Sequence, residues 1–339
     1  MSEIFIEGET INMEIIVTPF FNLAATMSFI DPFRVANYLE GKSIFKWQLV
    51  SEMGGIIKAS NGIEVSTKSI EEIKKGVSEL VFVSSSWEPE RHVSNALESH
   101  LRSAARQKTI LGGIDTGAFI LAQAGLLNGY TATLHYEHID AFQELFLDTK
   151  ISESLWVIDR RRVTCCGGAA TTDLSLHLIQ KTHGSALANA AARYLFSNSV
   201  RGPGAPQNPE DVDPFGSAVP KSIRNAIKIM EANLETPLKI ADVCQQVGLS
   251  HRQLDRIFAR FVHKAPALYY RDIRLDRARG LITQTQLTVA EIAFASGFSS
   301  QVHFSRAYKD RFGLPPTKDR VQGRVPFEFR AWPMHRASK

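Results

Sequence analysis

The first residues that could do chemistry lie where a predicted strand turns into a predicted helix. An apolar segment of strand length, residues 109–115, ends at Asp115, and a helical pattern starts directly after it at Thr116. Such a sharp turn lifts one side chain above a sheet, beside a helix amino terminus, where α/β enzymes place a nucleophile. The helix terminus should stabilise the Asp115 carboxylate as an anion. Asp115 is therefore a candidate for binding a cation, the alternative being a carboxylate that only caps the helix.

Rings follow two further predicted strands and should lie at the same end of the sheet. Trp87 follows the strand predicted at 79–86, and His135 and Tyr136 close the strand predicted at 131–136. Aromatic rings can face a cation, although packing is the more frequent role of such residues. This composition suits a small cationic or zwitterionic molecule. The predicted ligand-binding residues are Asp115, Thr116, Trp87, His135 and Tyr136.

Two similar patterns near the carboxyl end each predict a pair of short helices. Gly248 and Gly297 are the predicted turns, because glycine tolerates a left-handed backbone. Ser250 and Ser299 are the predicted caps of the following helices, and they lie 49 positions apart. Two short helices joined by a tight turn form a helix-turn-helix, whose second helix enters the DNA major groove. Two such units at this spacing predict a two-module DNA-binding domain.

The second helix of each module carries polar side chains opposite its apolar face. Arg252 and Arg256 are four residues apart and can reach guanine edges or phosphates. The predicted DNA-binding residues are Arg252, Arg256, Gln301, His303 and Arg306. The two helices should meet the major groove about one helical turn apart, or ~34 Å along the duplex.

The charge distribution agrees with a basic carboxyl-terminal part. The chain has 339 residues and a net charge of +4. Residues 221–339 hold 21 Lys and Arg against 10 Asp and Glu, giving +11, whereas residues 1–220 carry −7. A solvated basic surface would give the same excess, but here the charge coincides with the helix-turn-helix patterns. The carboxyl-terminal part therefore has the electrostatic character of a polyphosphate binder.

Strands alternate with helices through the amino-terminal part, which predicts an α/β fold with a doubly wound parallel sheet. The predicted strands are residues 13–20, 45–51, 62–66, 79–86, 109–115 and 131–136. The predicted helices in this part include 22–39 and 90–106, and two more fill 169–197. A hairpin is expected to turn near Asp159 and Arg160.

Composition divides the chain into parts. We predict a sensing domain over 11–200, a linker over 201–220, an all-α DNA-binding domain over 221–320 and a basic tail over 321–339. The linker is dense in proline and glycine and lacks hydrophobic periodicity, as expected of a hinge.

Cysteine content and hydropathy bear on the compartment. Cys165, Cys166 and Cys244 do not form a disulfide framework, and no pair has the C-x2-C spacing of a metal site, so we expect no metal or cofactor. The first ten residues lack a basic start followed by an apolar run, and no stretch approaches 18 apolar residues. The sequence therefore predicts a cytoplasmic protein that does not enter a membrane.

The motifs resemble a known family of regulators. The run GFSSQVHFSRAYKDRFGLPP is similar to the signature of AraC-family transcription regulators, and GGIDTGAFILAQAGLLNGYTATLHYEH resembles class I glutamine amidotransferase-like and PfpI-like domains. Nearly the whole chain resembles GlxA-type regulators, which join these two parts. The resemblance implies a homodimer that binds promoter DNA, responds to a small-molecule effector and works with RNA polymerase as an activator.

The departure from the catalytic relatives bears on activity. Those enzymes carry cysteine at the turn where this chain has Asp115, and a carboxylate cannot form the thioester that thiol-based amide hydrolysis requires. The resemblance is strongest to the subgroup that responds to arginine or to quaternary amines such as carnitine and betaine. The sequence therefore favours a sensor over an enzyme. The alternatives are a hydrolase or amidase with a DNA-binding tail, and a constitutive DNA-binding protein with an inert sensor fold.

Overall fold

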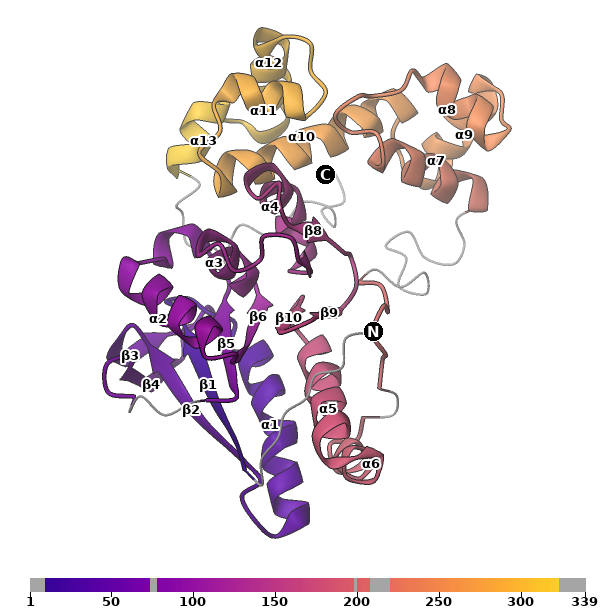
Figure 1. Ribbon diagram of the computed structural model, residues 1–339. Helices are drawn as coiled ribbons and strands as arrows, with labels where there is room; N and C mark the ends of the chain where they lie inside the picture. The colour runs from indigo at the N-terminus through magenta and orange to yellow at the C-terminus, as the bar shows by residue number, and fades with distance from the viewer. Residues whose placement is uncertain (1–9, 74–77, 198–199, 208–219, 323–339) are drawn as a thin grey trace. The chain divides into compact units, whose positions relative to one another are not determined.

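The computed structural model describes residues 10–73, 78–197, 200–207 and 220–322 (Figure 1). The chain divides into two compact units, Met1–Gln207 and Asn208–Lys339, and the division lies within the predicted linker. Residues 201–207, at the start of that linker, are hydrogen-bonded to the first unit. Arg201 donates to Asp173 through its side chain (2.8 Å), and the Gln207 amide donates to Thr133 (3.0 Å).

The first unit is built on a sheet that has eight strands within the described residues, in the order β3-β4-β2-β1-β5-β6-β10-β9. Neighbouring strands are parallel except at the two edges, where β3 pairs antiparallel with β4 and β9 with β10. This confirms the predicted α/β class. The strands are β1 Ile11–Val17, β2 Phe45–Ser51, β3 Met53–Lys58, β4 Glu64–Ser69, β5 Leu80–Ser85, β6 Ile110–Asp115, β9 Trp156–Asp159 and β10 Arg162–Cys165.

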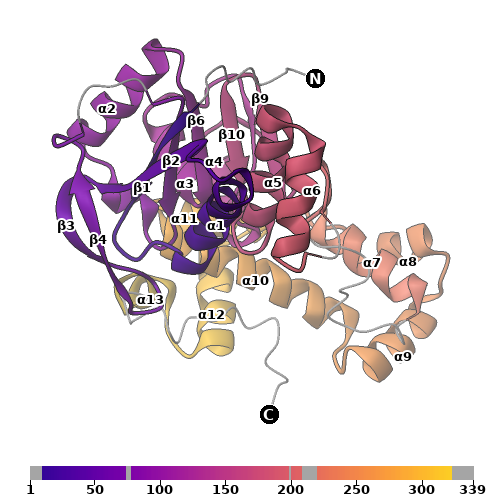
Figure 2. The same cartoon turned by 90° about the horizontal axis from the view of Figure 1, so that it is seen from below.

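Helices cover both faces of this sheet (Figure 2). Helices α1 (Leu23–Glu40), α5 (Ala170–His183) and α6 (Ser185–Tyr194) pack together on one face, and α2 (Asn95–Arg106) and α3 (Gly117–Gln123) lie on the other. Because both faces are covered, the central strands are almost continuously apolar, and all six residues of β5 are buried.

Three details of the first unit differ from the predictions. Strand β3 was not predicted, because its two glycines resemble a turn and, as an edge strand, it leaves Met53 and Ile56 exposed. The predicted helix 90–106 is a short 3-10 turn, Pro89–His92, followed by α2, which Ser94 caps. The predicted strand 131–136 is a strand only over β7, Thr131–Ala132, which pairs with β8, Lys150–Ile151, in a separate two-stranded sheet.

The shortening of that last strand has a local cause. The Thr133 backbone N–H donates to the Thr164 hydroxyl (2.8 Å), and the His135 backbone N–H donates to the carbonyl oxygen of Asp115 (3.3 Å). These two bonds take the place of the regular hydrogen bonds between strands, and they hold residues 133–135 beside the end of β6. Tyr136 therefore belongs to a 3-10 turn, Tyr136–His138, which leads into α4, Ile139–Leu145.

The second unit is all helical within the described residues, which confirms the predicted class. Its helices are α7 Lys221–Glu231, α8 Ile240–Val247, α9 His251–Phe261, α10 Pro266–Gln284, α11 Val289–Ala295, α12 Gln301–Phe312 and α13 Pro316–Gln322. Helices α8 and α9 form the first helix-turn-helix and α11 and α12 the second, with the long helix α10 between them (Figure 1). Leu254 and Phe258 are buried in the first module, and Phe304 and Tyr308 in the second.

Candidate effector site and nucleic-acid interface

Asp115 occupies a strained turn, as the sequence predicts. It ends β6 with a positive φ of 61°, a conformation that non-glycine residues rarely adopt, and α3 begins two residues later. Gly117 allows the start of α3 to lie close against β5, because a Cβ at this position would overlap the Val83 carbonyl oxygen. Strain of this kind is frequent at functional sites. The turn fixes the backbone from which the Asp115 side chain projects.

The Asp115 carboxyl is buried, and its protonation differs from our expectation. Asp115 is only 4% exposed, and its Oδ2 accepts a hydrogen bond from Asn22 Nδ2 (2.9 Å). Burial raises the pKa of Asp115 from 3.8 to about 7, although hydrogen bonds from Asn22 and from the Thr116 backbone oppose the rise. The expectation of a firmly ionised carboxylate was wrong, because desolvation outweighs the amino terminus of a seven-residue helix.

Thr116 is less suited to touch a ligand than the sequence suggests. Its side chain is fully buried, and its hydroxyl donates to the carbonyl oxygen of Ser86 (2.7 Å). This bond ties the turn to the end of the neighbouring strand β5. Thr116 therefore holds Asp115 in place.

The predicted rings lie close to one another around a buried histidine. The His135 and Tyr136 rings are stacked with centroids 4.7 Å apart, and the Trp87 and His138 rings are 6.4 Å apart. His138 lies 6.3 Å from His135, so it connects the two groups. Tyr136 is 41% exposed, whereas Trp87 and His135 are partly buried. Burial lowers the pKa of His135, which favours a neutral imidazole.

Two residues of this region were not predicted from the sequence. Asn22 lies 93 positions before Asp115, and nothing local in the sequence relates the two. His138 is 6% exposed, its Nδ1 has no hydrogen-bond partner among the described residues, and burial lowers its pKa to about 3. The spacing of His135 and His138, three residues apart before a helix, was the only available signal for it.

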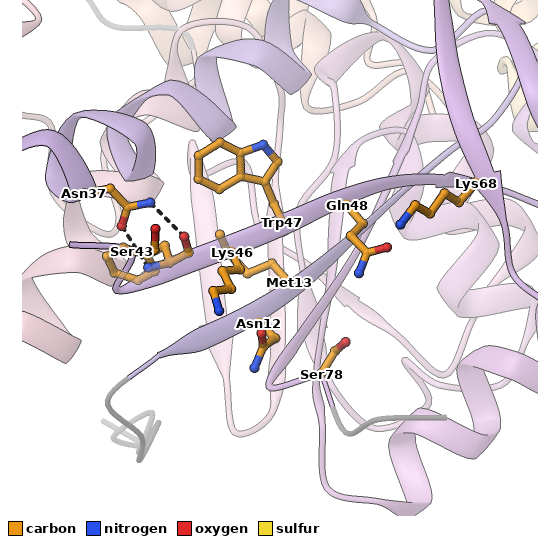
Figure 3. Close-up of a pocket in the computed structure, with 10 residues that line it drawn as sticks. Asn12, Met13, Asn37, Ser43, Lys46, Trp47, Gln48, Lys68 and Ser78 are labelled. Carbon is orange, nitrogen blue, oxygen red and sulfur yellow. Dashed lines mark hydrogen bonds between the residues drawn. The ribbon is translucent and has the colours of Figure 1, made fainter. Parts of the chain in front are cut away.

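A separate cavity of about 500 Å³ lies at the opposite end of the sheet, at the amino-terminal ends of β1 and β2 (Figure 3). Its lining includes Asn12, Lys46, Gln48 and Lys68. The strands are parallel and Asp115 ends β6, so this cavity is remote from the strained turn. None of the predicted ligand-binding residues lines it.

In the first helix-turn-helix, Ser250 caps α9 as predicted. Its hydroxyl accepts from the Gln253 backbone, and the Gln253 side chain accepts from the Ser250 backbone, completing a capping box. Arg252 and Arg256 are both exposed on the face opposite the buried Leu254. Asp255, a possible partner for these arginines, instead pairs with His251 (2.9 Å). Arg252 and Arg256 therefore project outward together.

In the second module the cap is Ser300 and not the predicted Ser299. The Ser300 hydroxyl accepts from the Val302 backbone N–H (3.3 Å), and α12 begins at Gln301. The turn glycines Gly248 and Gly297 are 49 positions apart, but the caps Ser250 and Ser300 are 50 apart. The second turn is thus one residue longer. Gln301, His303 and Arg306 are all exposed on α12.

Charged side chains of α10, both arginines and aspartates, hold the second module in place. Arg274 donates to the carbonyl oxygen of Gly297 (2.8 Å) and lies 4.7 Å from the centre of the Phe298 ring. Asp276 accepts from Arg311 of α12 at 2.7 Å, and Asp272 pairs with the same guanidinium at 2.8 Å. These charges join α10 to neighbouring elements, while Arg271 lies 3.6 Å from Asp272 within the helix. They orient the helix that carries Arg306.

No helix among the described residues is long and apolar enough to cross a membrane. In the same part of the chain, no group of three or more histidine, cysteine, aspartate or glutamate side chains is arranged to hold a metal ion.

Comparisons with known proteins agree with the division of the chain into an α/β unit and a helix-turn-helix unit. Residues 15–181 match the DJ-1/PfpI family, and residues 243–322 match a helix-turn-helix domain. The chain is 38% identical over 307 residues to the HTH-type transcriptional regulator CdhR of Pseudomonas aeruginosa, covering 90% of each chain. It is 40% identical over 232 residues to ArgR of the same species, covering 68% of this chain and 70% of ArgR. It is also 34% identical to GlxA of Rhizobium meliloti, covering 87% of this chain and 91% of that protein.

Proposed function

Because the chain belongs to the GlxA type of AraC-family transcriptional regulators, we propose that a small nitrogenous metabolite bound near Asp115 controls how it binds promoter DNA. The relatives are named transcriptional regulators, so the protein is a regulator and not an enzyme. Aspartate at the turn is consistent with this, because it replaces the thiol of the catalytic relatives.

The single observation that carries the effector proposal is the environment of Asp115. Asp115 is 4% exposed, and among the residues that the structure describes its carboxyl is bonded by Asn22 and the Thr116 backbone, with no cationic side chain paired to it. A buried carboxylate without a counter-ion is costly, so a cationic ligand would gain affinity by supplying the missing charge. The effector is therefore a cation or zwitterion, in the class of arginine, carnitine or a betaine.

The rings near the turn support the same class of ligand. Trp87 and Tyr136 supply aromatic faces, which attract a cation. His138 Nδ1, buried and unpaired within the described residues, could accept or donate one hydrogen bond to a polar group of the ligand. These three residues and His135 complete the proposed effector site with Asp115.

DNA binding is assigned to the exposed residues of the two recognition helices. Arg252 and Arg256 on α9, with Gln301, His303 and Arg306 on α12, form the proposed base-reading surface. We further propose a cytoplasmic homodimer that activates transcription with RNA polymerase. An effector can act only by binding two arrangements of the protein with different affinity.

The experiment compares full-length wild type with Asp115→Asn. Calorimetric titration with arginine, carnitine and glycine betaine should give binding of at least one to the wild type and a loss of at least tenfold in the variant. Glu79→Gln serves as the control, because Glu79 is a carboxylate bonded to Asn12 at the other end of the sheet. Equal affinities in wild type and Asp115→Asn would exclude the proposed site. Binding of promoter duplex, measured by fluorescence anisotropy, tests the DNA-binding assignment separately.

A further inference from the structure

The two recognition helices can be aligned by their caps. With Ser250 matched to Ser300, the pattern of buried and exposed residues is the same over the first ten positions of α9 and α12. Arg256 then corresponds to Arg306, and Leu254 to Phe304. Equivalent positions therefore face the same way in the two modules, and a difference in residue type at an exposed position is a difference in what the module presents to DNA.

The alignment pairs Arg252 with Val302. Both follow the cap by two positions and both are exposed, Val302 to 68%. The core of the module is formed by other side chains, including Phe304 and Tyr308, so packing does not require an aliphatic residue at 302. Single exposed apolar residues are common on protein surfaces. This one lies among the outward residues of a recognition helix, between Gln301 and His303.

The chemistry of the major groove distinguishes these two side chains. Guanine presents two acceptors, which an arginine guanidinium can bind in a bidentate manner. Thymine presents a 5-methyl group, which an aliphatic side chain can contact. Valine is short and β-branched, so it can cover a methyl group but cannot reach a phosphate or donate a hydrogen bond.

Resting on the proposed DNA-binding function, we propose that Val302 reads the 5-methyl group of a thymine. Arg252, at the equivalent place in the first module, contacts a guanine. Each helix-turn-helix module reads one half-site of the DNA. The two half-sites then carry the same base where Arg256 and Arg306 contact them, and different bases where Arg252 and Val302 contact them. Val302 is a specificity-determining residue of the second module.

The test removes single methyl groups from DNA. A duplex is selected from a randomised library with the full-length protein, and each thymine is replaced in turn by uracil, which lacks only the methyl group. The half-site read by α12 is identified as the one at which Arg306→Ala relaxes base preference. Wild type should lose roughly fourfold in affinity at one thymine of that half-site, the effect of burying one methyl-sized group. Val302→Ala should bind the thymine and uracil duplexes equally.

Two further variants make the result specific to Val302. Arg306→Ala should keep the preference for thymine over uracil, because it leaves Val302 in place. Val302→Arg, which copies the first module, should shift the preference at that position from thymine to guanine. Unchanged thermal unfolding of the two Val302 variants establishes that they are folded.

The inference is overturned if wild type is indifferent to every methyl group, or if Val302→Ala discriminates thymine from uracil as wild type does. A failure to enrich any duplex would overturn the DNA-binding function itself and is distinguishable from both of those results.

Discussion

The side chain of Asn22 donates a hydrogen bond of 2.9 Å to the carboxyl of Asp115, joining the start of α1 to the end of β6. The same asparagine caps α1, because its Oδ1 accepts from the Ala25 backbone N–H at 3.1 Å. One side chain therefore begins the first helix and supplies the hydrogen bond that favours ionised Asp115.

Asn22→Ser should raise the pKa of Asp115 above about 7. Serine retains a capping oxygen for α1 but lacks the amide donor that favours the charged carboxylate. The carboxyl carbon shift of Asp115, followed by NMR during a pH titration, measures the change. Asn22→Ala should give the same direction and also lose about 1 kcal/mol of stability with the cap. A pKa that falls in either variant would contradict this account.

The stability of the first unit should depend on Asp115 and pH. Its pKa is raised on folding, so between pH 4 and 7 the folded state binds more protons than the unfolded state. This contribution favours folding at low pH and declines as pH rises to about 7, by at most about 4 kcal/mol. His138 has the opposite slope, because its lowered pKa makes stability rise between about pH 3 and 6.5.

Comparing wild type with Asp115→Asn isolates the contribution of Asp115 to the pH dependence of stability, because the contribution of His138 is the same in both proteins. Denaturant unfolding at pH 5 and pH 8 should show the variant gaining stability relative to wild type at the higher pH. An equal difference at the two pH values would mean that Asp115 does not titrate between them.

Affinity for a cationic effector should rise with pH. Such a ligand pairs with the ionised form of Asp115, whose pKa is about 7. At pH values below this pKa, each further decrease of one pH unit lowers the ionised fraction about tenfold. Calorimetry at pH 6, 7 and 8 should therefore show affinity increasing and then levelling, with protons released on binding. Asp115→Asn should have no such pH dependence. Flat affinity in the wild type would place the cation elsewhere.

Substitutions on α12 should separate base contacts from phosphate contacts. Arg306→Ala or Gln301→Ala should each cost about 1–3 kcal/mol in binding and relax specificity at one base position. Binding to the selected duplex and to a set of single-base variants measures both effects. A uniform loss across all sequences, with a reduced salt dependence, would instead identify a phosphate contact.

The two turn glycines should differ in their tolerance of alanine. Both have positive φ, 70° at Gly248 and 73° at Gly297, so alanine costs about 1 kcal/mol of backbone strain at either. At Gly248 a Cβ has open space, whereas at Gly297 it would overlap the Leu234 carbonyl oxygen. Gly297→Ala should therefore lower the unfolding free energy clearly more than Gly248→Ala. Equal losses of unfolding free energy in the two variants, measured by chemical denaturation, would show that the backbone around Gly297 shifts at no cost to accommodate the added Cβ.

The sequence was most informative where structure is set locally. Strand β2 was predicted at its observed bounds, and the turn at Asp115 and the cap at Ser250 were also correct. These features depend on hydrophobic periodicity and on capping side chains, which are visible within a few residues.

What the sequence could not supply depends on residues far apart in the chain. The pKa of Asp115 is set by burial beneath distant elements and by Asn22, and the strand predicted at 131–136 is cut short by bonds from Thr133 and His135 to Thr164 and Asp115. The misplaced cap at Ser299 has another cause, since two adjacent serines, Ser299 and Ser300, offer the same capping oxygen.

The extra residue in the second turn has a consequence for transplanting operator preference between modules. An ungapped alignment at 49 positions would set Arg252 against Gln301, whereas the caps set it against Val302. One residue along a helix is a rotation of about 100°, so a graft made in the ungapped frame would turn its side chains away from the bases they were chosen to read. Chimeric regulators assembled from this repeat should be joined at the serine that starts each recognition helix, and not at the glycine before it.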